Sequence, residues 1–184
     1  YYSLLDWHHP DYRTTNHDRY IQYLHGQIRE LLTGYGRLDG LWFDGLGGKP
    51  TDWDAETLFQ MARQLQPHLV INTRCGLPGD FETPEQGLPE KGLVDTHGRP
   101  VPWETCLTLN NNWGYHAGDH EWKSPELVVH ALVEAVSKNG NLLLNVGPNG
   151  RGRIPEPSVR VLEEVGRWMG RNGESIHGAG AAEE

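Results

Sequence analysis

The sequence predicts an α/β protein of the parallel (β/α)8-barrel type, incomplete in this chain, with about five strands and four helices. Short apolar runs alternate with segments of helical periodicity, a pattern typical of a parallel sheet. The run Gly40-Leu-Trp-Phe-Asp44-Gly45 ends on a carboxylate, as strands do at the catalytic mouth of a barrel. No glycine-rich phosphate turn follows the first strand, which argues against the alternative of an open doubly wound sheet.

The first half of the chain is expected to hold three strands and two helices. In chain order they are strand 1–5, helix 17–33, strand 40–44, helix 55–66 and strand 69–73. Asn16 and Asp54 stand at the N-cap positions of the two helices, and Pro67 ends the second. Gly34 or Gly36 can end the first helix.

The second half begins with a long loop and is expected to add two strands and two helices. The order is loop 75–102, strand 103–109, irregular segment 110–123, helix 125–139, strand 141–146 and helix 157–171. Ser124 is the expected N-cap of the third helix, with Pro125 in its first turn. We therefore predict a partial barrel domain over residues 1–177 and a disordered tail over 178–184.

Length and composition narrow the class of protein. The 184 residues suffice for one domain with a core, and a closed barrel typically needs ~250. The net charge of −9 argues against nucleic acid or an anionic membrane as partner. Cys75 and Cys106 have no metal-type spacing and are expected to be free thiols. The sequence does not disclose the compartment, and the bacterial cytoplasm is only slightly favoured.

Strand alternation selects the residues that face the predicted active site. Side chains alternate along a strand, so Trp42 and Asp44 share one face of the run 40–44. The other face is apolar and packs on helices, which turns Trp42 and Asp44 toward the barrel interior. The same reasoning turns Asn72 and Arg74 inward from the next strand. Asp44 and Arg74 are thus expected to meet at one mouth, either as part of an active site or as a structural ion pair.

A second carboxylate is expected from the loop after that strand. Glu85 can reach over a bound sugar, protonate the leaving oxygen and later deprotonate water. A glycoside hydrolase needs at least two carboxyl groups in its active site, and two neighbouring strand ends can supply them. Glu82 and Glu104 are alternatives, and Glu104 ranks lower because it lies at the start of a strand.

The histidines do not predict a metal site. His116 and His120 lie in a glycine-bearing loop rather than on a helix face, and no third ligand is evident. Hydrogen bonding to sugar hydroxyls, or ordinary loop structure, is the preferred interpretation. Trp113 and Tyr115 precede these histidines in the same segment and, like Trp7, can either stack on a sugar face or pack internally.

Seven motifs resemble the α-L-fucosidases of glycoside hydrolase family 29, in the family's order and across nearly the whole chain. They are Tyr1-Tyr-Ser-Leu-Leu-Asp-Trp7, Leu41-Trp-Phe-Asp-Gly45, Asn72-Thr-Arg74, Thr83-Pro-Glu-Gln86, Trp103-Glu-Thr-Cys106, Trp113-Gly-Tyr115 and Leu142-Leu-Leu-Asn-Val-Gly-Pro148.

The resemblance implies a retaining exo-hydrolase that removes terminal L-fucose from fucosylated glycans or glycosides and needs no metal or organic cofactor. Asp44 matches the family's nucleophile and Glu85 its usual acid/base. The residues that match the lining of the fucose pocket are Tyr2, Trp42, Arg74 and Trp113. The family's barrel begins upstream, with strands that supply histidines and a tryptophan, and His8-His9 belongs to a different motif.

An open parallel sheet exposes two edges and an apolar face, so we expect this chain to associate. The preferred partner is a second copy that completes the barrel, and the alternative is a chain that bears the upstream strands. Three other functions stay open: a non-catalytic fucose-binding remnant, a split-barrel piece active only after assembly, and a metal-dependent barrel hydrolase.

Overall fold

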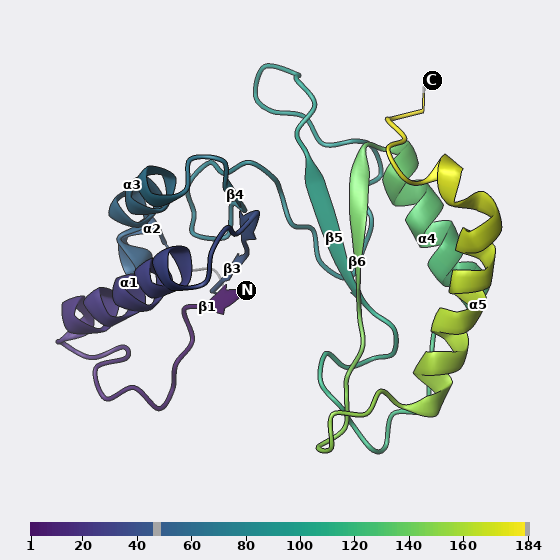
Figure 1. The fold of residues 1–184 in the computed structure, drawn as a ribbon, viewed down its shortest axis with the longest axis horizontal. Helices are drawn as coiled ribbons and strands as arrows, with labels where there is room; N and C mark the ends of the chain where they lie inside the picture. Colours follow the sequence, from purple (N-terminus) through teal and green to yellow (C-terminus); the bar gives the residue numbers. More distant parts are fainter. Residues whose placement is uncertain (46–48, 183–184) are drawn as a thin grey trace. The chain divides into compact units, whose positions relative to one another are not determined.

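The computed structural model describes residues 1–45 and 49–182 (Figure 1). The chain divides into two compact units, residues 1–82 and residues 83–184. Each unit combines helices with short parallel strands. In the described residues no helix is long and apolar enough to cross a membrane.

The described part of the first unit, residues 1–45 and 49–82, contains four short strands and three helices. In chain order they are β1 (Tyr2–Ser3), α1 (His17–Gly34), β2 (Gly40–Leu41), β3 (Phe43–Asp44), α2 (Pro50–Trp53), α3 (Ala55–Leu65) and β4 (Val70–Ile71). β1 pairs in parallel with β3, and β2 pairs in parallel with β4. The predicted strand 40–44 is therefore divided at Trp42, because its first part bonds to β4 and its last part to β1.

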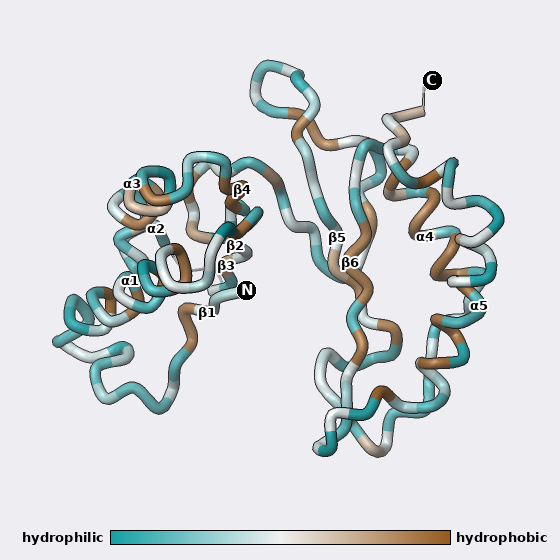
Figure 2. Tube along the Cα trace, viewed as in Figure 1, coloured by the Kyte–Doolittle hydropathy of each residue, from teal (hydrophilic) through white to brown (hydrophobic). Residues whose placement is uncertain are grey.

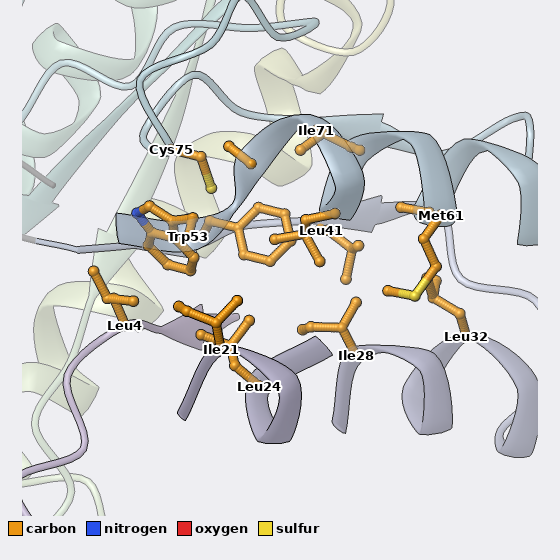
Figure 3. Close-up of a cluster of buried hydrophobic side chains, with 14 of the residues drawn as sticks. Leu4, Ile21, Leu24, Ile28, Leu32, Leu41, Trp53, Met61, Ile71 and Cys75 are labelled. Carbon is orange, nitrogen blue, oxygen red and sulfur yellow. The ribbon is translucent and has the colours of Figure 1, made fainter. Parts of the chain in front are cut away.

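The core of the first unit lies between its strands and helices α1 and α3 (Figure 3). Ile28 of α1 and Leu58 of α3 are fully buried, as is Phe43 of β3. Leu41 is buried in the same core, whereas Trp42 keeps partial exposure. The predicted alternation along this strand is thus confirmed.

Helix starts in the first unit differ from the prediction in detail. Asn16 precedes α1 as expected, but its side chain makes no capping hydrogen bond. Asp54 also makes none, and its φ of 45° lies in the left-handed region that Asp tolerates better than most residues. Asp54 differs from the expectation because it is also the C-cap of α2 (Pro50–Trp53), a short helix that the sequence did not predict.

The second unit is built on one pair of longer strands. β5 (Trp103–Thr108) pairs in parallel with β6 (Gly140–Asn145) over six residue pairs. Helix α4 (Pro125–Ser137) packs on β6, and α5 (Glu156–Asn172) packs on α4. A short 3-10 helix, Gly173–Ser175, follows α5. Figure 2 shows the hydrophobic colour continuing along β6, which carries three consecutive leucines.

Two predicted details of the second unit are confirmed. The Ser124 side chain accepts a hydrogen bond from the N–H of Leu127, and α4 begins at Pro125.

At the start of β6, a Cβ on Gly140 would lie 2.3 Å from the Trp103 ring, so a side chain there would displace the indole. The N–H of Ala182 bonds to the carbonyl of Ser137, and residues 183–184 of the predicted tail lie outside the described residues.

The described strands form three two-stranded parallel sheets. The α/β class with parallel strands is therefore observed. Residues 1–45 and 49–182 contain six strands and five α-helices against the five and four expected, since one predicted strand is divided and α2 is added. Closure into a barrel and the domain range 1–177 stay predictions.

Candidate functional site

Asp44 lies at the C-terminal end of β3, and its carboxylate is held on both oxygens. Arg74 donates to Oδ1 at 2.9 Å, and the Tyr1 hydroxyl donates to Oδ2 at 2.5 Å. The side chains of Asp44 and Arg74 are 23% and 20% exposed, so the pair is open to solvent on one side. The predicted meeting of Asp44 and Arg74 is confirmed.

Aromatic rings lie beside this ion pair. The Arg74 guanidinium carbon is 4.5 Å from the centroid of the Trp42 ring, within the range of cation–π attraction. The Tyr1 ring stacks on Trp42 with centroids 5.5 Å apart and planes at 24°. Tyr1, Trp42, Asp44 and Arg74 thus form one group, here called the Asp44 cluster. It offers a carboxylate, a cation and an apolar ring face, the combination that a sugar with both hydroxyls and apolar carbons requires.

Tyr2 lies apart from the Asp44 cluster. It pairs with Phe43 in the parallel register and packs against the core, and its hydroxyl donates to Gln27 on α1. Burial raises the pKa of the Tyr2 phenol well above its usual value, with the nearby Tyr20, Tyr23 and Asp6 adding to the shift.

Sequence reasoning selected Tyr2 and missed Tyr1, because the choice depends on the register of β1 against β3. Residues paired across parallel strands face the same side, so Tyr2 must follow Phe43 toward the helices. Tyr1 then faces the side of Trp42 and Asp44. The contact of Tyr2 with substrate stays a prediction, and the surroundings of Tyr2 do not support it.

Glu85 belongs to the second unit and lies in a segment that bonds to β5. The N–H of Gln86 donates to the carbonyl of Cys106 at 2.9 Å, and the N–H of Cys106 donates to the carbonyl of Pro84 at 3.1 Å. The Gln86 amide also bonds to the Thr108 hydroxyl at 3.0 Å. The backbone on both sides of Glu85 is therefore fixed, while Glu85 itself is exposed.

The two alternatives to Glu85 have other surroundings. The Glu82 carboxylate accepts a hydrogen bond of 2.7 Å from the Thr73 hydroxyl and so joins two segments of the first unit. Glu104 lies within β5 and is half-buried. A spacing of ~5–5.5 Å between Asp44 and Glu85 stays a prediction, as do the roles of both residues.

Trp113 lies on a loop that its neighbours hold in place. The residue is 41% exposed, and its carbonyl accepts a hydrogen bond of 2.8 Å from the Asn145 side chain at the end of β6. A Cβ on Gly147 would lie 2.7 Å from the Gly114 backbone, so the loop and the end of β6 approach closely. The ring is therefore available for stacking.

Asp119 organises the rest of this loop. Its carboxylate accepts hydrogen bonds from the Asn112 side chain at 2.7 Å and from the N–H groups of Asn111 and Glu121. These bonds, that of Asn112 first, hold the pKa of Asp119 below its usual value. An open cavity of about 430 Å³ lies here, lined by residues 111–112, 116 and 118–121.

Within residues 1–45 and 49–182, no group of three or more His, Cys, Asp or Glu side chains could hold a metal ion. His120 instead lies beside the Trp122 ring, with centroids 6.3 Å apart. Cys75 and Cys106 are both buried and are not joined by a disulfide, as predicted.

Comparison with known proteins gives a consistent result. A family model described as Alpha-L-fucosidase matches residues 1–174. The plasma α-L-fucosidases of Pongo abelii and Homo sapiens are each 32% identical to this chain over 96% of its length. The chain spans about 40% of the length of these curated relatives, 41% and 40% respectively.

Solved structures agree with the sequence comparison. α-L-Fucosidase isoenzyme 1 from Paenibacillus thiaminolyticus superimposes with a TM-score of 0.94 at 47% identity, over 100% of this chain and 51% of its own. A GH29 α-L-fucosidase from Bacteroides thetaiotaomicron, trapped as a covalent intermediate with 2-fluoro-fucosyl fluoride, superimposes with a TM-score of 0.83 at 29% identity. That match covers 98% of this chain and 48% of the other.

Proposed function

Because the chain belongs to the α-L-fucosidase family, we propose that it carries the catalytic carboxylates of a retaining exo-glycosidase that releases terminal L-fucose from α-L-fucosides. One observation carries the proposal. The carboxylate of Asp44 ends a parallel strand, is oriented by Arg74 and borders the Trp42 ring. Parallel α/β barrels place their catalytic side chains at such strand ends.

The proposed reaction is a double displacement. Asp44 attacks the anomeric carbon while Glu85 protonates the oxygen of the leaving group, which yields a covalent fucosyl-enzyme. Glu85 then takes a proton from water, the water attacks the anomeric carbon, and Asp44 leaves. Two inversions at one carbon restore the original configuration. The chemistry needs neither a metal ion nor an organic cofactor.

The solved relative from Bacteroides thetaiotaomicron supports this scheme. Its covalent intermediate was trapped in a variant with a Glu-to-Gln substitution. A covalent intermediate is the defining species of a double displacement, and its persistence without a glutamate fits a glutamate that activates water. In this chain, that role would belong to Glu85.

The remaining residues supply recognition in this proposal. L-Fucose is a 6-deoxy sugar and has a methyl group that favours an aromatic surface, which Trp42 and Trp113 would provide. Arg74 would orient the carboxylate of Asp44 and bond a sugar hydroxyl with its remaining N–H groups. Tyr1 is a further candidate for the pocket because its hydroxyl reaches Asp44.

We also propose that the parallel strands of this chain form part of a (β/α)8 barrel that strands of a second copy or another chain complete. Unpaired strand edges favour such association. Light scattering on the pure protein checks this, and a monodisperse monomer would contradict it.

The decisive experiment is covalent trapping. After incubation with 2-fluoro-fucosyl fluoride, peptide mass spectrometry should find the fluorofucosyl group on Asp44, and Asp44→Asn should take up none. Proton NMR should show α-L-fucose as the first product. An adduct on another residue, or β-L-fucose as first product, would disprove the assignment. Fucose binding without turnover would favour the non-catalytic remnant.

Glu85 and Glu82 form a matched pair for the acid/base. Glu85→Ala should lose turnover of substrates with poor leaving groups, and azide should restore turnover of activated ones by replacing the water that Glu85 activates. Glu82→Ala should lose only the contact with Thr73 and show no azide rescue. The reverse pattern would transfer the role to Glu82.

A further inference from the structure

The Asn72 side chain makes a two-point contact with the backbone next to Asp44. Its Oδ1 accepts from the N–H of Phe43 at 2.9 Å, and its Nδ2 donates to the carbonyl of Phe43 at 2.9 Å. Asn72 and Phe43 are both fully buried. Phe43 directly precedes Asp44, so one amide group fixes both polar atoms of the residue before the carboxylate.

The amide takes the place of a peptide group in the sheet. The ladder between β2 and β4 pairs Gly40 with Val70 and Leu41 with Ile71. Beyond it, the Asn72 side chain bonds to one edge of β3, while on the other side the carbonyls of Trp42 and Asp44 accept from the N–H groups of Tyr2 and Leu4. A primary amide suits this position because it has one carbonyl and an N–H donor, as a peptide unit does.

Asn72 is itself firmly held. Its backbone forms a parallel bridge with Phe81, and the N–H of Asp80 donates to the carbonyl of Ile71 at 2.7 Å. A Cβ on Gly79 would lie 2.5 Å from that carbonyl, so the loop lies directly on β4. The side chain therefore projects from a fixed backbone.

The contact of Asn72 with Phe43 links the segment that carries Arg74 to the segment that carries Asp44. Asn72 lies two residues before Arg74, and its amide holds the residue before Asp44. We propose that Asn72 is a positioning residue that sets the carboxylate of Asp44 against Arg74 for attack on the sugar, an inference that rests on the proposed fucosidase function. Asn72 acts through Phe43 and does not touch substrate.

Gln66 provides a matched control in the same unit. It too is a buried amide that binds backbone: Oε1 accepts from the N–H of Leu38 at 2.9 Å, and Nε2 donates to the carbonyls of Leu32 and Gly36. The loss of either amide leaves buried peptide groups unpaired and lowers stability. Of these two amides, only that of Asn72 binds the residue next to Asp44.

The experiment compares Asn72→Leu with Gln66→Leu, using an aryl α-L-fucoside at a temperature where circular dichroism shows both to be folded. We expect Asn72→Leu to lower kcat about 10²-fold, with a much smaller change in KM, because a displacement of the reacting group by about 1 Å costs that much. Gln66→Leu should keep kcat within about twofold of the parent, despite a similar fall in Tm. Equal losses of kcat in the two variants would overturn the proposal.

A second pair covers the case in which Asn72→Leu does not fold. Asn72→Asp keeps the acceptor for the N–H of Phe43 but loses the donor to its carbonyl. It should lower kcat more than Gln66→Glu, which makes the same chemical change in the control. The proposal fails if it does not.

Crystal structures give a readout that needs no activity. The hydrogen bond between Arg74 and Asp44 should be lost or lengthened in Asn72→Leu, or in Asn72→Asp if the leucine variant does not fold. It should remain near 2.9 Å in Gln66→Leu. If the parent protein showed no turnover of the fucoside, the proposed function would be contradicted. The length of the hydrogen bond between Arg74 and Asp44 in the variants would then still test the positioning role. A hydrogen bond of unchanged length in the Asn72 variant as well as in Gln66→Leu would refute the positioning role.

Discussion

Arg74 donates a hydrogen bond of 2.9 Å to Asp44, 30 residues away in the chain, while its guanidinium lies 4.5 Å from the centre of the Trp42 ring. One planar cation thus meets a carboxylate and an aromatic ring at once. Lysine cannot reproduce this arrangement, because its ammonium is a compact point charge without a planar fork.

Arg74→Lys should therefore lower kcat/KM of fucoside hydrolysis by about tenfold or more, since cation–π and charge-assisted contacts are each worth about 1 kcal/mol or more. Steady-state kinetics on an aryl α-L-fucoside checks this. Arg99→Lys is the control, because Arg99 bonds to Asp95 with a side chain that is 74% exposed, where the pair contributes little. Equal effects in both variants would contradict a role of Arg74 in the site.

Tyr1 and Tyr2 should separate activity from stability. Tyr1→Phe removes the hydrogen bond to Asp44 and should lower kcat/KM about tenfold with little change in stability, as the loss of about 1.4 kcal/mol predicts. Tyr2→Phe removes the bond to Gln27 and should cost about 1 kcal/mol in the free energy of unfolding. Urea denaturation and kinetics on both variants check this, and the reverse result would return Tyr2 to the sugar pocket.

Two helix starts should respond differently to alanine. Ser124→Ala should lower the free energy of unfolding by about 1 kcal/mol, because its side chain caps the N–H of Leu127. Asn16→Ala should cost less than about 0.5 kcal/mol, because the Asn16 side chain makes no capping bond. Urea denaturation of both variants measures the difference, and equal costs would mean that residue type alone decides capping here.

Stability should fall at alkaline pH because of a buried phenol. Burial, with smaller contributions from Asp6, Tyr12 and Tyr23, raises the pKa of Tyr20 from 10.0 to about 12, and the hydroxyl donates to the carbonyl of Leu4. The folded state thus binds a proton that the unfolded state loses. The stabilisation is complete below pH 10 and is lost as the pH rises toward 12, at up to about 1.4 kcal/mol per pH unit.

Urea denaturation between pH 9 and pH 11.5 checks this slope. Tyr20→Phe should have a lower stability at pH 8 and a shallower decline above pH 10. A part of the slope should remain, since burial also raises the pKa of the Cys75 thiol to about 12 and the pKa of the Tyr2 phenol well above its usual value. An unchanged slope in Tyr20→Phe would show that the phenol titrates normally in the folded state.

Much of the fold followed from local patterns. The apolar spacing of α1, the serine before α4 and the alternation from Leu41 to Asp44 are short-range properties, and each predicted its element correctly. The meeting of Asp44 with Arg74 also followed, because parallel strands that point the same way bring their ends to one edge.

Other features depend on contacts between distant segments. The division of the strand at Trp42 arises because β1 and β4 bond to different parts of it. Helix α2 was missed because its four residues are too few for a periodic pattern. The choice of Tyr1 over Tyr2 required the register against Phe43, which no local pattern contains.

The sequence by itself determined the family motifs, the order of the five predicted strands and four predicted helices, and the face on which Asp44 lies, because these depend on spacing along the chain. Only the tertiary structure decided which neighbours complete its surroundings: Tyr1 at the carboxylate, and the Asn72 amide in place of a peptide group. The physical reason is that a hydrogen bond needs two groups within about 3 Å, and only the folded chain brings residues 29 positions apart to that distance.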